Sequence, residues 1–138
     1  MAIAQAANCG VDTDLGLRSW DLGKLEGKSI AAHKIEIQDF KTHKEKVPTG
    51  GESWGEFERS AHATLDRLMQ CAMSSSAPIA LVTHGSFIQI FFARYGDFDL
   101  GIRYDSSPLE QAGVAALYLT REGMQLRTLR GGKDDLDE

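Results

Sequence analysis

Cysteine is scarce and long apolar runs are missing, and both absences exclude classes of protein. Cys9 and Cys71 are the two cysteines, and no CxxC spacing occurs. This pattern indicates neither a zinc site nor a disulfide framework, and we expect two buried or half-buried thiols in a reducing compartment. No stretch approaches the roughly 18 apolar residues of a membrane span, and the start "MAIAQAANCG" lacks the basic residues of a signal peptide. We therefore expect a cytoplasmic protein with no membrane partner.

Positive charge is also in deficit, with a net charge of −5 and a pI near 5.3. Since no basic stripe with interleaved aromatic residues is present, nucleic acid is not the expected partner. A small anionic ligand stays compatible, because a local pocket can be positive on an acidic protein. The apolar fraction of 42% suffices for a packed core. We expect one domain over residues 1–130 and an acidic flexible tail, "GGKDDLDE", over residues 131–138.

Helix and strand signals alternate along the chain. The sequence predicts a short helix closed by Gly10 and a charged surface helix within residues 30–46. Ser53 and Glu56 form a capping box, and apolar residues at helical spacing follow from Phe57 to Ala72. The run "IALV", residues 79–82, predicts a strand buried on both faces of a parallel sheet. A helix over residues 86–96 and an antiparallel hairpin over residues 114–129 complete an expected α/β layer fold with a mixed sheet.

His84 lies at the point where the predicted strand 79–82 turns into a helix. In open α/β sheets, ligands bind beyond the carboxyl ends of the strands. Gly85 would let a ligand approach the backbone, and the amides of Ser86 and Phe87 would open a helix that favours an anion. A histidine here can act as an acid, a base or a phosphate donor. The alternative is a strand-end histidine bonded to a neighbouring carbonyl.

Four segments together resemble the histidine phosphatase superfamily, the phosphoglycerate-mutase-like proteins. In chain order they are "LRSWDLGKLEGKS", "PTGGESWGEFERSAHATLDRLM", "ALVTHGSFIQIFFARYG" and "VAALYLTREGMQLRTL". The resemblance implies a three-layer sandwich with a mixed, mostly parallel sheet. It also implies an α/β protein that acts on or binds a phosphomonoester, carried by a small molecule or a phosphoprotein. It implies no metal and no organic cofactor.

The sequence departs from this family at the catalytic residues. The family's nucleophile is the histidine of an Arg-His-Gly, whereas His84-Gly85 is the sole His-Gly here. Ser19 stands where many members have a glutamate as general acid. The resemblance therefore carries over only His84, as a donor of hydrogen bonds to the phosphoryl group. We expect a chain that is inactive alone. The alternatives are a non-catalytic binding or assembly module (a pseudophosphatase), one half of a split phosphatase, or an unrelated α/β fold with a chance Thr-His-Gly.

Other polar residues are candidates for the same pocket. Arg18 is a candidate phosphate ligand, because arginine is a common anion clamp, and its alternative role is a surface ion pair. Ser19, Glu52 and Ser53 are expected at the pocket rim, and Ser53 also has a sufficient role as an N-cap. We expect surface roles for His33, His43 and His62, since polar residues on polar faces are the ordinary case. Trp20 and Trp54 are expected in the core or at its rim.

The resemblance begins inside the family pattern, which predicts an unpaired apolar edge on the strand 79–82. Three explanations are open. A second copy of the chain covers this edge in a homodimer, a separate partner chain covers it, or the natural protein is longer.

Overall fold

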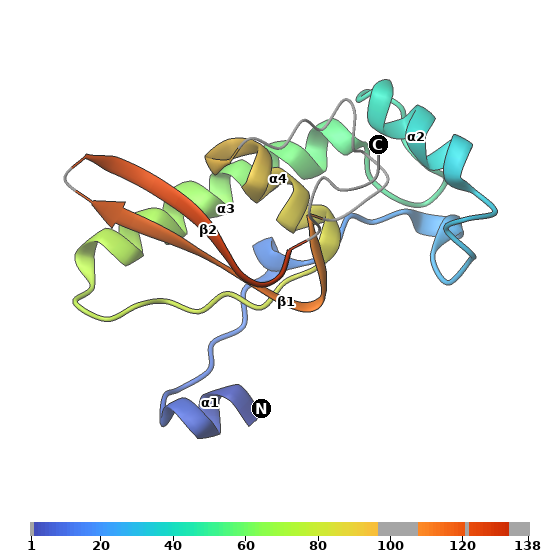
Figure 1. Cartoon of the computed structure of the whole chain (residues 1–138). Coiled ribbons are helices and arrows are strands. Elements are labelled where there is room, and N and C mark those ends of the chain that lie inside the picture. Colours follow the sequence, from blue (N-terminus) through green and yellow to red (C-terminus); the bar gives the residue numbers. More distant parts are fainter. Residues whose placement is uncertain (1, 97–107, 121, 133–138) are drawn as a thin grey trace.

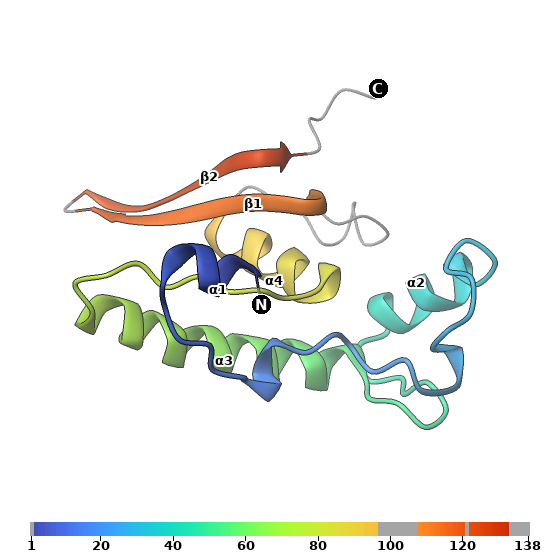
Figure 2. The same cartoon turned by 90° about the horizontal axis from the view of Figure 1, so that it is seen from below.

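The computed structural model describes residues 2–96, 108–120 and 122–132, with no side-chain description for residues 110, 131 and 132. These described residues form four α-helices, two short 3-10 helices and a hairpin (Figure 1). Their bounds are α1 Ala2–Ala7, η1 Leu15–Leu17, η2 Gly23–Leu25, α2 Lys34–Thr42, α3 Trp54–Ser74, α4 Gly85–Tyr95, β1 Leu109–Thr120 and β2 Gly123–Gly132. In Figure 2, α3, α4 and the hairpin lie in three successive layers, with α4 in the middle.

Helix α3 begins where the sequence predicts. The Ser53 hydroxyl accepts a hydrogen bond from the Glu56 amide at 3.2 Å, and the Glu56 carboxylate accepts one from the Ser53 amide at 3.1 Å. This reciprocal capping satisfies two amide groups that a helix start leaves unpaired. The predicted apolar face is confirmed over its first half, since Phe57, Ala61 and Leu65 are buried.

The core lies between α3, α4 and the loop before η2. Its buried apolar members are Trp20, Trp54, Phe57, Ala61, Leu65, Phe87 and Ile90. Trp20 and Trp54 make an edge contact with ring centroids 5.0 Å apart, so both tryptophans pack as expected. The core therefore joins the Trp20 loop to the start of α4, and this junction also positions the candidate site.

The hairpin is confirmed, and it is longer than the sequence indicates. Strands β1 and β2 pair antiparallel, with Leu117 opposite Leu126, and the register shifts between Leu109 and Ala115. The described residues thus hold helices and one two-stranded antiparallel sheet, which agrees with an α/β protein at that level. The predicted mostly parallel sheet is not found in them.

The predicted buried strand over residues 79–82 is wrong for the described chain. This segment is a loop, and Ile79 and Val82 expose 43% and 59% of their surface. The physical reason is that a strand needs a hydrogen-bonded neighbour. No described segment pairs with residues 79–82, so an apolar sequence alone does not make them a strand.

Two smaller predictions, on the first helix and on the cysteines, are also corrected. The first helix ends at Ala7, before Gly10, because Asn8 takes a left-handed conformation with φ of 51°. Cys9 and Cys71 are exposed, so the predicted burial of both thiols is wrong.

The charged helix is confirmed as α2, which has no buried residue. The tail beyond residue 132 lies outside the described residues, and none of the described helices is long and apolar enough to span a membrane.

Candidate functional site

Two segments, residues 18–24 and 48–53, meet through their backbones. The Glu52 amide donates to the Asp21 carbonyl at 3.0 Å, and the Lys24 amide donates to the Thr49 carbonyl at 2.9 Å. The approach requires glycine at position 51, because a Cβ there would lie 2.4 Å from the Asp21 carbonyl oxygen. These contacts hold residues 18–21 beside the start of α3.

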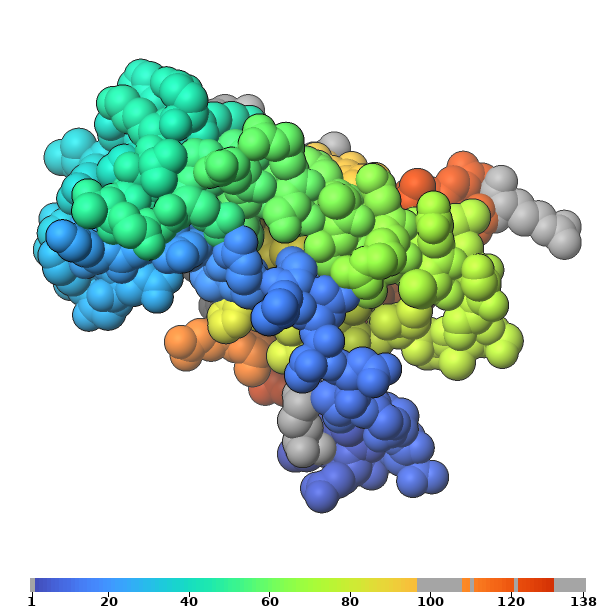
Figure 3. Space-filling model, turned by 180° about the vertical axis from the view of Figure 1, so that it is seen from behind, coloured from blue at the N-terminus to red at the C-terminus, as the bar shows by residue number. Residues whose placement is uncertain are grey.

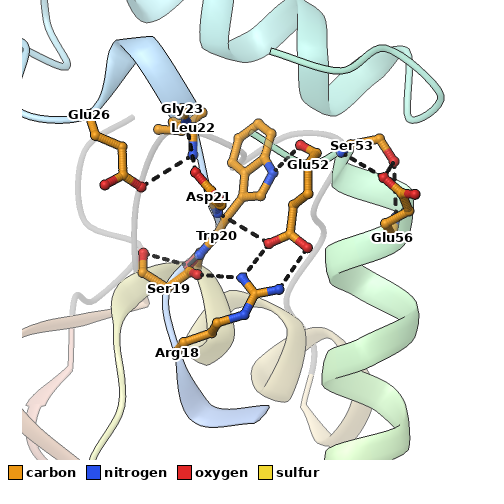
Figure 4. Close-up of polar contacts among 11 residues, drawn as sticks. Arg18, Ser19, Trp20, Asp21, Leu22, Gly23, Glu26, Glu52, Ser53 and Glu56 are labelled. Carbon is orange, nitrogen blue, oxygen red and sulfur yellow. Dashed lines mark hydrogen bonds and ion pairs between the residues drawn. The ribbon is translucent and has the colours of Figure 1, made fainter. Parts of the chain in front are cut away.

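Glu52 clamps the first loop with every polar group that it has (Figure 4). Its carboxylate binds both terminal nitrogens of Arg18, one of them at 2.7 Å, and accepts the Asp21 amide at 3.2 Å. Its carbonyl accepts the indole N–H of Trp20 at 3.0 Å. The Glu52 hydrogen bonds raise the pKa of Arg18. The predicted rim residue Glu52 is therefore the residue that organises this loop.

Arg18 lies close to the other candidates but its guanidinium is engaged. Besides Glu52, it donates to the Ser19 carbonyl at 3.0 Å, and its carbon lies 5.9 Å from the centroid of the Phe57 ring. Glu52 and the Ser19 carbonyl take three of the roughly five N–H donors of a guanidinium, so a phosphate could reach Arg18 through its Nε side or by displacing Glu52. The role of Arg18 as a phosphate ligand stays a prediction, and its alternative, an ion pair, is present.

The Ser19 loop also touches the start of α4. The Trp20 amide donates to the Ser86 hydroxyl at 3.1 Å, and the hydroxyl oxygens of Ser19 and Ser86 are 3.4 Å apart. Thr83 donates its hydroxyl proton to the Leu17 carbonyl at 2.6 Å. Residues 17–20 are thereby held against residues 83–86, with His84 between the two anchor points. The sequence interpretation missed the Ser86 side chain, although its position in the first turn after His84-Gly85 was a usable signal.

His84 is the N-cap residue of α4, with φ of −109° and ψ of 163°. Its carbonyl accepts the Ile88 amide at 3.0 Å, whereas its exposed side chain makes no hydrogen bond to any described residue. The predicted alternative, a histidine tied to a neighbouring carbonyl, does not occur among these residues. The amides of Gly85, Ser86 and Phe87 also have no described acceptor. A helix start of this kind presents free N–H groups and the positive end of the dipole.

The other three histidines each contact a residue outside residues 17–20 and 83–86. His33 pairs with Glu36 at 3.2 Å, and His43 pairs with Asp39 at 2.8 Å, both along the region of α2. His62 lies 3.4 Å from Arg94. Since Arg94 is ten residues beyond His84 on α4, a rise of 1.5 Å per residue separates them by roughly 15 Å along the axis.

Two further findings complete the site. Ser53 serves as the α3 cap and is buried, so its hydroxyl faces Glu56 and not the space near His84. Lys41, which the sequence did not single out, donates to Gln89 at 2.8 Å and lies 4.6 Å from the Trp54 ring centroid. Within residues 2–96, 108–120 and 122–132, no group of three His, Cys, Asp or Glu residues is placed to hold a metal ion.

The family model of the histidine phosphatase superfamily (branch 1) matches residues 1–131, and the chain belongs to this superfamily. A search among curated proteins finds no match to the chain.

Proposed function

We propose that this chain binds a phosphomonoester, with the phosphate seated at the start of α4. The observation that carries the proposal is the state of His84, whose exposed ring has no described partner beside three free amides at a helix start. In a member of the histidine phosphatase superfamily, a phosphate group is the anion that such a site is expected to take. The ligand is a phosphorylated small molecule or a phosphoprotein of the cytoplasm.

Each group has a defined task in this proposal. The amides of Gly85, Ser86 and Phe87 point along the helix axis toward the anion. The His84 ring donates a hydrogen bond to a phosphoryl oxygen and, when protonated, adds a positive charge. The Ser19 hydroxyl, next to that of Ser86, borders the same space. No metal or organic cofactor is needed for this binding.

We propose further that the chain alone binds the ester without hydrolysing it. Hydrolysis through phosphohistidine needs a second histidine that attacks phosphorus and displaces the alcohol, and then a water that releases phosphate. His33, His43 and His62 each contact a residue outside residues 17–20 and 83–86, and Arg18 is paired with Glu52. If another polypeptide supplied the nucleophile, His84 would stabilise the charge that develops on the phosphoryl oxygens during transfer.

A non-catalytic binding or assembly module is the second candidate, and Ser19 favours it. A serine hydroxyl does not protonate a leaving alcohol as a glutamic acid does. Ser19 instead contributes to the contact with Ser86 that joins the loop to α4. In either case we propose that residues 79–82 become a strand of a three-layer, mostly parallel sheet once a neighbouring strand pairs with them.

The test compares the wild-type chain with His84→Ala and with the matched control His62→Ala, in EDTA. Binding of phenyl phosphate is followed by ³¹P NMR, and hydrolysis is followed with p-nitrophenyl phosphate. We expect His84→Ala to weaken binding about tenfold or more, because a hydrogen bond to a charged group contributes about 1.5–3 kcal/mol. His62→Ala should bind like the wild type, and no variant should turn over. Equal binding by all three chains would refute the site, and hydrolysis lost in His84→Ala would refute the claim of inactivity.

A further inference from the structure

Thr83 fixes the chain one residue before His84. Its hydroxyl donates to the Leu17 carbonyl at 2.6 Å, a short hydrogen bond between positions 66 apart in the sequence. No other hydrogen bond joins residues 78–83 to a described residue, and these residues form neither helix nor strand. The position of the peptide that leads into His84 therefore depends on this one side chain.

The acceptor of this bond is itself held in place by α3. Leu17 ends η1, and the Asp14 carboxylate caps η1 by accepting the Gly16 amide at 2.9 Å. The second carboxylate oxygen of Asp14 binds Arg67 of α3 at 2.6 Å. Figure 3 shows the blue segment that contains η1 lying against the green helix α3. The longest helix of the described chain thus holds the carbonyl to which Thr83 is anchored.

His84 needs an anchor on this side because α4 alone does not fix the direction of its side chain. The helix fixes the carbonyl of His84, which accepts the Ile88 amide at 3.0 Å. The ψ angle of His84 is 163°, outside the helical range, and rotation about that bond turns its amide nitrogen and its Cβ together. Because Thr83 holds the peptide that contains this nitrogen, it also holds the direction in which the Cβ of His84 points.

We propose that Thr83 is a positioning residue, whose hydrogen bond to Leu17 orients His84 toward the anion site at the start of α4. The inference rests on the proposed function, since the anion is the phosphate placed there. A side chain already held in its binding direction loses less conformational freedom when the phosphate binds. The Thr83 proton is donated to Leu17, so Thr83 acts through His84 and not on the phosphate itself. Serine supplies the same hydroxyl, whereas valine keeps the shape of threonine and lacks it.

The test is a double-mutant cycle of Thr83→Val with His84→Ala, read by ³¹P NMR titration with phenyl phosphate. Thr83→Val should weaken binding about threefold to tenfold, the worth of one hydrogen bond, and Thr83→Ser should bind within about twofold of the wild type. In the His84→Ala background, Thr83→Val should change binding by less than about twofold, because no ring is left to orient. Thr120→Val is the matched control, since it also removes a hydroxyl that donates to a carbonyl, that of Gly123 at 3.0 Å. It should bind like the wild type.

A second measurement needs no ligand. The ¹³C relaxation order parameter of the His84 imidazole, whose signal is assigned by its loss in His84→Ala, should fall in Thr83→Val and keep its wild-type value in Thr83→Ser and Thr120→Val. An unchanged order parameter in Thr83→Val would overturn the inference and leave the phosphate proposal standing.

An equal loss of phosphate binding on Thr83→Val with and without His84 would also overturn the inference, because Thr83 would then act through the fold as a whole. If the order parameter falls in Thr83→Val while His84→Ala binds phosphate like the wild type, Thr83 does orient His84 and the phosphate proposal is the one that fails. The two failures are therefore distinguishable.

Discussion

Substituting Gly51 by alanine tests the contact between the two site loops. The added Cβ would lie 2.4 Å from the Asp21 carbonyl oxygen, 2.8 Å from the Gly23 nitrogen and 3.0 Å from the Leu22 carbonyl carbon. All three are backbone atoms, so no side chain can rotate away. Non-bonded heavy atoms pack without repulsion from about 3.5 Å, so the two loops must separate by roughly 1 Å.

The free energy of unfolding should fall by about 2–4 kcal/mol. Overpacking of a well-packed contact costs about 1–3 kcal/mol. The separation also breaks the hydrogen bond from the Glu52 amide to the Asp21 carbonyl, which contributes about 1 kcal/mol. Gly10→Ala is the matched control, because a Cβ at Gly10 meets nothing within 4 Å. It should be neutral or stabilise by about 0.4–1 kcal/mol, since alanine restricts the unfolded chain.

Urea unfolding followed by tryptophan fluorescence measures both variants, since Trp20 and Trp54 are buried in the core. With a slope of about 2 kcal/mol per molar urea, the middle of the ordinary range, the Gly51→Ala midpoint should lie about 1–2 M below that of the wild type. An unfolded Gly51→Ala chain would agree with the upper end of this range. The reasoning is refuted if Gly51→Ala and Gly10→Ala unfold at the same urea concentration.

Two further predictions concern a buried hydroxyl and the response to acid. The Tyr95 hydroxyl is buried without a described hydrogen-bond partner, and burial raises its pKa. Tyr95→Phe should therefore leave the free energy of unfolding unchanged or raise it by up to about 1 kcal/mol, as measured by urea unfolding. A clear loss of stability would contradict this prediction, because it would mean that the hydroxyl has a partner. Hydrogen bonds from Ser53 lower the pKa of Glu56 below 4.5, and those from Arg67 and Lys46 lower the pKa values of Asp14 and Asp39 below 3.8. Because these lowered pKa values mean that the unfolded chain binds more protons, the stability that these three carboxylates contribute should be present above about pH 4.5 and decrease as the pH falls through their folded-state pKa values. Glu56→Gln should make that decrease shallower in urea titrations between about pH 6 and pH 3, whereas Glu45→Gln should keep the wild-type slope.

The elements that the sequence predicted well depend on local signals. The α3 cap needs only Ser53 and Glu56, three residues apart, and the hairpin needs only two alternating runs around a tight turn. His84 is likewise placed by its immediate neighbours, since a helix begins directly after it. Such features are decided by residues within one or two turns of each other, and a single sequence contains them in full.

The features that the sequence did not give depend on distant partners. Residues 79–82 carry a strand sequence, yet a strand exists only beside another strand. The pairing of Arg18 with Glu52 joins positions 34 apart in the chain, and no spacing rule predicts it. Cys9 and Cys71 were expected to be buried from residue type alone, but burial is decided by which surfaces pack together, and neither thiol packs into the small core.

The ion pair of Arg18 with Glu52 competes with phosphate for the guanidinium. Glu52 binds both terminal nitrogens and the Ser19 carbonyl takes a third N–H, which leaves a phosphate only the Nε side of Arg18. A phosphate that displaced Glu52 from Arg18 would leave the Glu52 carboxylate with the Asp21 amide alone and would loosen the loop that carries Ser19. The proposed binding of phosphate by His84 and the α4 amides avoids this conflict, because none of those groups has a described partner to give up. The site as folded therefore favours recognition through α4, with Arg18 and Glu52 holding the neighbouring loop in place.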